Sequence, residues 1–169
     1  KLFLFLLVFT IACHNPNPKP TASVIVHGGA GYVTTDEMTE QEEEETRATI
    51  EKSLQKSNEH LANGGTSVEA VQIAINILED STHFNAGKGS VFTSAGTHEL
   101  DASIMNGENV QAGAVAGLTN IKNPIDAAIA VMEHSPHVFL IGKGAEEFAV
   151  AHGMETVPQS YFYNEDRYN

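Results

Sequence analysis

Apolar positions in the first part of the chain follow a strand pattern and then a helical one. Residues 22–27 form a β-rich apolar run that barely alternates with polar positions, which predicts a strand buried on both faces. Thr34, with Glu37 three residues later, matches a capping box and predicts the start of a long helix. We expect that helix to end near Leu61, because Asn63-Gly64-Gly65 is a typical helix stop.

A second helix is predicted directly after this stop. Thr66 with Glu69 repeats the capping-box pattern, and the helix is expected to end near Glu79. Its apolar stripe consists of Val68, Val71, Ala74, Ile75 and Leu78. This spacing predicts a helix with one buried face.

Short β-like runs replace the helical pattern in the middle of the chain. They cover residues 91–93, 100–105 and 110–118, and they predict a strand meander. Asn106-Gly107 predicts the hairpin turn between the last two runs. Alanine and glycine dominate residues 112–117, so we expect a neighbouring element to pack closely on this strand.

Two further helices are predicted after the meander. Asn123 and Pro124 provide an N-cap and a first-turn proline for a helix through about Glu133. Residues 142–152, followed by Gly153, predict the last helix. Helices and strands therefore gather in separate layers, which predicts an α+β fold in one domain over residues 22–169.

The first residues resemble an export signal rather than part of this domain. Residues 1–13 combine a basic start, a short apolar stretch and a small residue before Cys13, as in a signal peptide with a bacterial lipobox. Residues 14–21 are rich in proline and asparagine and predict a spacer. We therefore expect export to the periplasm, or a lipoprotein anchored through Cys13, although Thr10 departs from the usual lipobox. Simple export is the alternative.

Charge and cysteine content narrow the possible partners. The chain carries a formal net charge of −13 with only nine Lys and Arg residues, which argues against nucleic acid as a partner. Much of the negative charge lies between Glu37 and Glu51 and predicts a solvated helix face. Cys13 is the only cysteine, so no internal disulfide is expected.

Two glycine-rich segments are the main candidates for a functional site. His27-Gly28-Gly29-Ala30-Gly31 follows the first predicted strand, and such an exit brings backbone N–H groups close to a ligand or to another buried strand. Residues 84–90 lack the spacing and the following helix of a phosphate loop. Asn85 in this segment either stabilises its own loop or positions a substrate or nucleophile.

Other polar residues favour structural roles. Glu99 and Asp101 are two apart, but we expect Asp101 to be a buried structural hydrogen-bonding group rather than half of an acid/base pair. His134 and His137 flank a proline at a helix end, which suits a helix C-terminus better than a metal site.

The motifs in series resemble the isoaspartyl peptidase / plant-type L-asparaginase family. The resemblance covers about residues 24–153. Its segments are 27–31, 84–87 with Gly89, 97–105, 112–115, 123–125, 135–137 and 142–145.

The resemblance implies an N-terminal nucleophile hydrolase with a four-layer αββα sandwich, of which this chain is half. Members are made as one precursor that cleaves itself and leaves a threonine, whose α-amine activates its own hydroxyl, at the start of a second subunit. The chain corresponds to the α-subunit, with its own β-subunit as partner in an (αβ)2 heterotetramer. Expected substrates are β-aspartyl dipeptides and asparagine. The family's Gly-Thr-Val-Gly does not occur in the chain, since neither Gly65-Thr66 nor Gly96-Thr97 fits it.

The resemblance also implies roles for residues that are present. Asn85 would lie near the nucleophile, and His27, Gly28 and Gly29 would pack around the site. No cofactor is implied for catalysis, but a structural sodium ion is. Backbone carbonyls would bind it, as suits a hard cation. The matching positions are Leu78, Glu79, Ser81, Phe84, Ala86 and Lys88.

Two alternatives stay open. One is a glycosylasparaginase-like amidohydrolase with the same chemistry on a glycan-linked asparagine. The other is an inactive, truncated, lipid-anchored surface protein. We expect the chain by itself to be inactive and to expose a large apolar surface where a partner sheet belongs.

Overall fold

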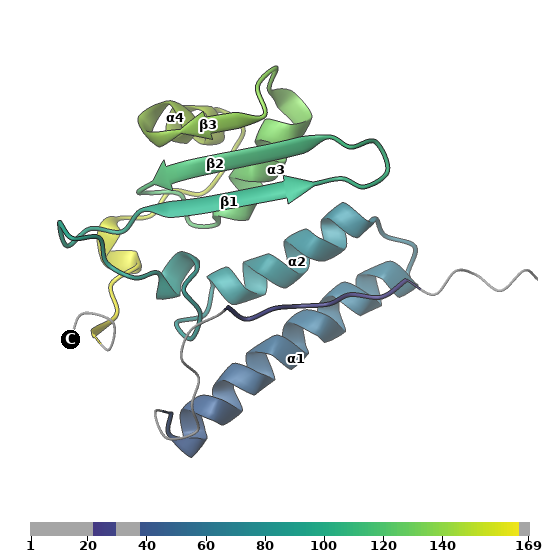
Figure 1. Cartoon of the computed structure of the whole chain (residues 1–169), viewed down its shortest axis with the longest axis vertical. Helices are drawn as coiled ribbons and strands as arrows, with labels where there is room; N and C mark the ends of the chain where they lie inside the picture. The colour runs from purple at the N-terminus through teal and green to yellow at the C-terminus, as the bar shows by residue number, and fades with distance from the viewer. Residues whose placement is uncertain (1–21, 30–37, 166–169) are drawn as a thin grey trace, which may run out of the picture.

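The structure is a computed structural model that describes residues 22–29 and 38–165. It has the predicted α+β character, with a helical hairpin beside a three-stranded sheet that is covered by two helices (Figure 1). The elements are α1 (Glu40–Ala62), α2 (Ser67–Glu79), the 3-10 turn η1 (Gly87–Gly89), β1 (Leu100–Met105), β2 (Ala112–Leu118), α3 (Pro124–His134), β3 (Phe139–Ile141), α4 (Gly142–Ala151) and the 3-10 turn η2 (Gln159–Tyr161). No helix within the described ranges is long and apolar enough to cross a membrane.

Capping boxes start both helices of the hairpin. Thr66 and Glu69 cap α2 as predicted, and Glu79 ends it. The start of α1 differs from the prediction, because Thr39 and Glu42 form its capping box, whereas Thr34 and Glu37 lie outside the described residues. The Glu42 carboxylate accepts from the Thr39 backbone N–H at 2.7 Å, which satisfies a donor that the first turn leaves free.

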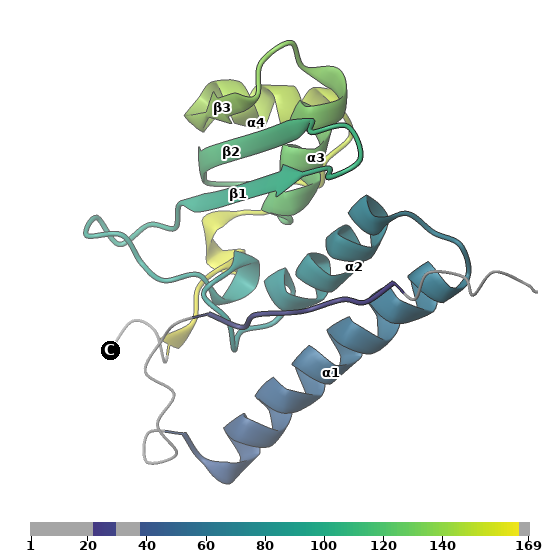
Figure 2. The same ribbon diagram turned by 45° about the vertical axis from the view of Figure 1, so that its right-hand side comes forward.

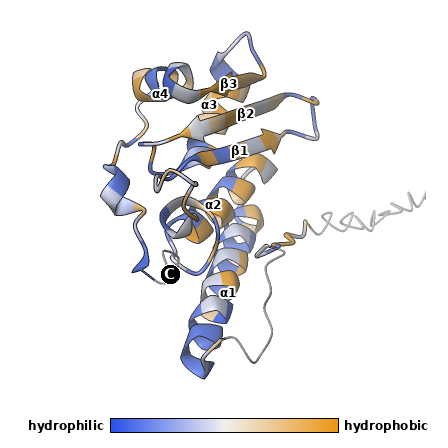
Figure 3. Cartoon of the chain, turned by 60° about the vertical axis from the view of Figure 1, so that its left-hand side comes forward, coloured by the Kyte–Doolittle hydropathy of each residue, from blue (hydrophilic) through white to orange (hydrophobic). Residues whose placement is uncertain are grey.

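The two helices pack closely through small residues. Ser53 and Ser57 of α1 are buried, as are Ala70 and Ala74 of α2. Each serine hydroxyl donates to a carbonyl in the preceding turn of its own helix, so burial leaves no unpaired donor there. The acidic first turns of α1 point to solvent, as the charge pattern predicts (Figure 3).

The sheet has the order β1-β2-β3. β1 and β2 form the predicted antiparallel hairpin, and β2 pairs in parallel with β3. β2 begins at Ala112 rather than residue 110, because Val110 adopts a left-handed conformation (φ 62°) that ends the pairing. The strand predicted at 91–93 is absent, since the Thr93 N–H bonds to the Thr97 carbonyl and closes a tight turn instead.

Helix α3 lies directly on the hairpin and forms the core with it. A Cβ at Gly113 would come within 3.0 Å of the Ala128 carbonyl oxygen and of the Met132 backbone nitrogen. The alanine- and glycine-rich β2 therefore admits the α3 backbone, which explains its composition. The buried cluster includes Leu100, Ile104, Val115, Leu118, Ile121, Ile125, Ala127, Ala128, Val131, Met132, Ala149 and Phe162.

Within residues 22–29 and 38–165, nothing covers the opposite face of the sheet. Side chains that alternate with the buried ones point to this face, and the large apolar ones are exposed: Met105 by 60%, Phe139 by 53% and Ile141 by 64%. Strand β2 contributes Ala112, Ala114 and Ala116 to the same face. They pair across the strands with Met105, Phe139 and Ile141, respectively. The predicted apolar surface is therefore present on one side of the sheet.

The prediction of a buried strand at residues 22–27 is wrong. Residues 22–29 form no strand, and Ile25 is 94% exposed. The segment runs in extended form beside α1 and α2 (Figures 1 and 2). A strand needs a hydrogen-bonded neighbour, and the described residues place none beside this one.

Replacing Gly113 tests the contact between β2 and α3. We expect Gly113→Ala to lower the free energy of unfolding by about 1–3 kcal/mol, because the added methyl group forces α3 off the strand. Gly144→Ala is the matched control, since a Cβ there meets nothing within 4 Å. Urea unfolding of both variants checks this, and equal stabilities would contradict the close contact.

Candidate active site

The two glycine-rich segments meet in space. A Cβ at Gly28 would lie 3.1 Å from Phe84 Cε1 and 3.4 Å from Ile50 Cδ1, so the segment passes over the loop that follows α2. His27 Nδ1 accepts from the Gly29 N–H at 3.0 Å, and His27, Gly28 and Gly29 are all exposed. Two motifs far apart in sequence thus form one surface.

Asn85 follows Phe84 in this loop and is exposed. Its amide oxygen accepts from the Val91 backbone N–H at 2.9 Å, which fastens the loop's exit. This is the loop-stabilising role that the sequence left open. The bond uses the amide oxygen as acceptor, and the same side chain also carries N–H donors.

Backbone carbonyls converge inside the loop. A Cβ at Gly89 would meet the carbonyl oxygens of Thr82 at 2.8 Å and Ser81 at 2.9 Å, and that of Phe84 still closer. Of the other predicted sodium ligands, the Leu78 carbonyl accepts from the Ser81 N–H and the Ala86 carbonyl from the Gly89 N–H, both at 3.1 Å. A cradle of carbonyl oxygens around a residue that must be glycine fits a hard cation.

Glu79 is the most unusual ionisable group near this loop. It is buried, and burial, its largest influence, raises the pKa of Glu79 to about 8 despite hydrogen bonds that act the other way. Its carboxylate accepts from the Ile125 N–H at 3.0 Å and from Asn123 Nδ2 at 3.1 Å. A buried carboxyl therefore caps the N-terminus of α3.

Sequence reasoning missed a buried polar pair at the other end of the loop. Ser90 Oγ and His98 Nδ1 are 3.0 Å apart, and both residues are buried. The side chain of Gln159 fixes the His98 backbone by accepting from its N–H at 2.8 Å and donating to its carbonyl at 3.0 Å. No spacing pattern signals this pair, because its members come from separate segments.

The remaining polar candidates lie away from this surface. Asp101 accepts from the Gly117 N–H at 2.8 Å, so its structural role is confirmed, but the residue is exposed rather than buried because it sits at a bulge between β1 and β2. Glu99 is exposed. His134 lies in the last turn of α3, where its ring stacks on His152 with centroids 5.3 Å apart. His137 lies beyond the helix and is exposed.

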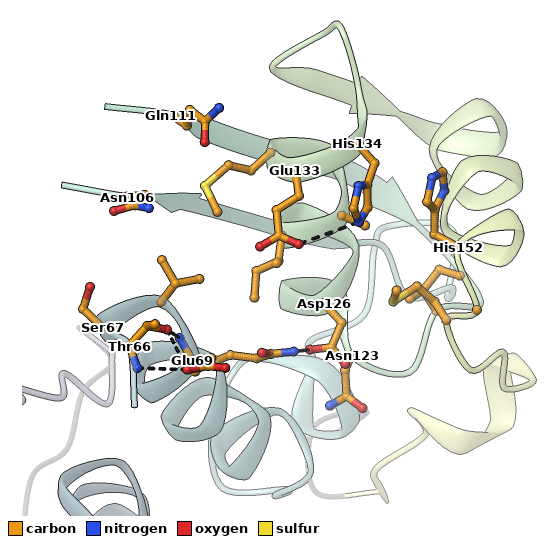
Figure 4. A pocket seen from close by; sticks show the side chains of 18 of the residues that line it. Thr66, Ser67, Glu69, Asn106, Gln111, Asn123, Asp126, Glu133, His134 and His152 are labelled. Atoms are coloured by element: carbon orange, nitrogen blue, oxygen red, sulfur yellow. Dashed lines mark hydrogen bonds and ion pairs between the residues drawn. The ribbon is translucent and has the colours of Figure 1, made fainter. Parts of the chain in front are cut away.

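A cavity of about 940 Å³ lies elsewhere, between α2, α3 and the turn of the hairpin (Figure 4). Its labelled acidic side chains, Glu69, Asp126 and Glu133, are spread along two helices, and Asp126 already accepts from Gln72. Neither glycine-rich segment lines it. The predicted site residues therefore do not belong to this cavity.

Comparison with known proteins identifies one protein family and several relatives. The sequence profile of the asparaginase family matches residues 20–169. The chain is 43% identical over 147 residues to the isoaspartyl peptidase of Escherichia coli, covering 87% of this chain and 46% of that protein. It is 45% identical over 130 residues to the plant-type L-asparaginase of Pyrococcus abyssi, covering 75% and 40%. A Dictyostelium discoideum protein, provisionally named isoaspartyl peptidase/L-asparaginase, is 47% identical over 146 residues, covering 86% and 42%.

The chain therefore belongs to the asparaginase family, as the motif series predicts. Relatives matched over most of its length are named as hydrolases of isoaspartyl peptides or asparagine. The chain spans less than half the length of these curated relatives.

Two variants of Asn85 test whether its hydrogen bond to the Val91 N–H stabilises the loop. We expect Asn85→Ala to lower the free energy of unfolding by about 0.5–1.5 kcal/mol, because the Val91 N–H loses its acceptor. Asn85→Asp keeps an acceptor oxygen and should unfold within about 0.5 kcal/mol of the wild type. Urea unfolding measures both, and an equal loss in the two variants would show that the bond to Val91 is not the cause.

Proposed function

We propose that this chain is the α-subunit portion of an isoaspartyl peptidase / L-asparaginase that hydrolyses β-aspartyl dipeptides and the side-chain amide of asparagine. The observation that carries the proposal is the meeting of the two family motifs, residues 27–29 and the loop with Asn85, on one surface. We propose that the nucleophilic threonine stands in a Gly-Thr-Val-Gly sequence, which residues 1–169 do not contain.

Two surfaces that the described residues leave uncovered support a partner for this chain. The apolar sheet face carrying Met105, Phe139 and Ile141 is suited to a second sheet, which would complete a four-layer αββα sandwich. The extended residues 22–29 and the outer edge of β1 are suited to additional strands. We propose that the β-subunit fills both and that two such αβ units form the (αβ)2 heterotetramer.

In the proposed reaction, the threonine, Asn85 and residues 27–29 have different roles. The α-amine of the threonine takes the proton from its own hydroxyl, the hydroxyl oxygen attacks the β-carbonyl, and the amine or ammonia leaves with that proton. Water then hydrolyses the aspartyl ester. Asn85 directs an amide N–H toward the nucleophile or its water, while His27, Gly28 and Gly29 form the adjoining wall.

A sodium ion is proposed in the loop as a structural group. The carbonyls of Leu78, Glu79, Ser81, Phe84, Ala86 and Lys88 would hold it, and its charge would compensate for carbonyl dipoles that point toward one another. The convergence of the Ser81 and Phe84 carbonyls on Gly89 supports this assignment.

The direct test uses the full-length gene product. We expect it to cleave into two chains, seen on a denaturing gel, and then to release aspartate from a β-aspartyl dipeptide or ammonia from asparagine. Asn85→Asp should keep the fold but lower turnover at least tenfold, because a carboxylate cannot donate a hydrogen bond.

Three outcomes decide between the alternatives. Cleavage without release of aspartate or ammonia from either substrate would contradict the proposal. Hydrolysis confined to glycan-linked asparagine would favour a glycosylasparaginase-like enzyme instead. A reading frame without Gly-Thr-Val-Gly would favour the inactive surface protein.

Export is also proposed, on the sequence of residues 1–21 alone, which lie outside the described residues. The protein would be periplasmic or anchored through a lipid on Cys13. In a bacterial host, labelled palmitate should enter the wild type but not Cys13→Ala. Equal labelling of the two would contradict the anchor.

A further inference from the structure

Glu79 joins parts of the chain that are distant in sequence. It is 4% exposed and is the last residue of α2. Its two carboxylate oxygens accept from the Ile125 N–H and from Asn123 Nδ2, both at the N-terminus of α3. The side chain therefore ties the end of one helix to the first turn of another.

The backbone of the same residue faces the carbonyl-rich loop. A Cβ at Gly87 would come within 3.0 Å of the carbonyl oxygen, the carbonyl carbon and the Cβ of Glu79. Gly87 also has a positive φ of 49°, so the turn fits against Glu79 only with glycine there. Gly87 begins η1, and Gly89 ends it beneath the converging carbonyls.

We propose that Glu79, through its side-chain carboxyl group, is the positioning residue of the cation loop. The hydrogen bonds from α3 to this side chain hold the Glu79 carbonyl and the turn at Gly87 in the arrangement that a hard monovalent cation binds. The inference rests on the sodium site proposed above, and it gives the side chain a task separate from that of the carbonyl. Without the hydrogen bonds between Glu79 and α3, the cation must itself order this part of the backbone when it binds, so the affinity for the cation falls.

The geometry of the contact favours a carboxyl group over other residues. Glutamine would fill nearly the same space. The α3 terminus presents two donors, one to each side-chain oxygen of Glu79. Both oxygens of a carboxyl group can accept whether or not the group is protonated, whereas the amide nitrogen of glutamine cannot accept. Glu79→Gln therefore keeps the volume and loses one of the two hydrogen bonds.

The test measures the thermal midpoint of the full-length protein in mixtures of sodium and tetramethylammonium chloride at constant ionic strength. Binding to the folded state raises the midpoint as sodium replaces the larger ion. We expect Glu79→Gln to need at least about fivefold more sodium for the same rise as the wild type, since fixing the backbone of one residue has a cost of that order. A merely structural defect would lower the midpoint equally in both salts.

Glu146→Ala is the control. Glu146 Oε1 accepts from the Thr119 backbone N–H at 2.6 Å and from the Thr119 hydroxyl at 2.7 Å, so the variant loses two hydrogen bonds at α4, away from the loop. It should lower the midpoint without changing the sodium dependence. If Glu79→Gln does not fold, Asn123→Ala removes one donor and leaves Glu79 in place, and it should also raise the sodium requirement.

The inference is overturned if the wild type shows no rise specific to sodium, or if the folded variants keep the wild-type sodium dependence. A hydrolysis assay on the same wild-type preparation separates this result from the proposed function. Sodium dependence that responds to Glu79 without any hydrolysis would retain the positioning role and contradict the enzymatic one.

Discussion

The close packing of α3 on the β1–β2 hairpin is the contact on which the rest of the structure depends. Gly113 has no side chain, so the backbone of α3 approaches the strand at Ala128 and Met132. This approach buries the apolar residues of β1, β2 and α3 in one cluster. It also places the N-terminus of α3 where Glu79 can reach it, and so connects the sheet to the helical hairpin.

The loop between α2 and β1 is held from both ends. At one end, Glu79 fastens it to α3, and at the other, Ser90 pairs with His98, whose backbone is fixed by Gln159. Between these points, the Asn85 side chain fastens the loop's exit at Val91. A segment with little regular structure is thereby given a defined conformation, as a site with exposed functional groups requires.

The open sheet face and the extended residues 22–29 have a common physical basis. Both are apolar or edge-forming, and neither is covered within the described residues. The chain spans less than half the length of its matched relatives. The proposed β-subunit accounts for both with one partner.

Local sequence by itself determined the helices, the hairpin and the family. Capping boxes, glycine stops and alternating residues act within a few positions, so the end of α1, all of α2 and the turn at Asn106-Gly107 could be predicted. The sequence predicted the start of α1 at Thr34, whereas the structure has Thr39 as the N-cap and Glu40 as the first residue of the helix. The structure alone showed that no strand among the described residues pairs with residues 22–27, since pairing depends on a neighbour. It alone brought Glu79 to Ile125 and Ser90 to His98, because contacts between separate segments arise from packing and leave no periodic signal.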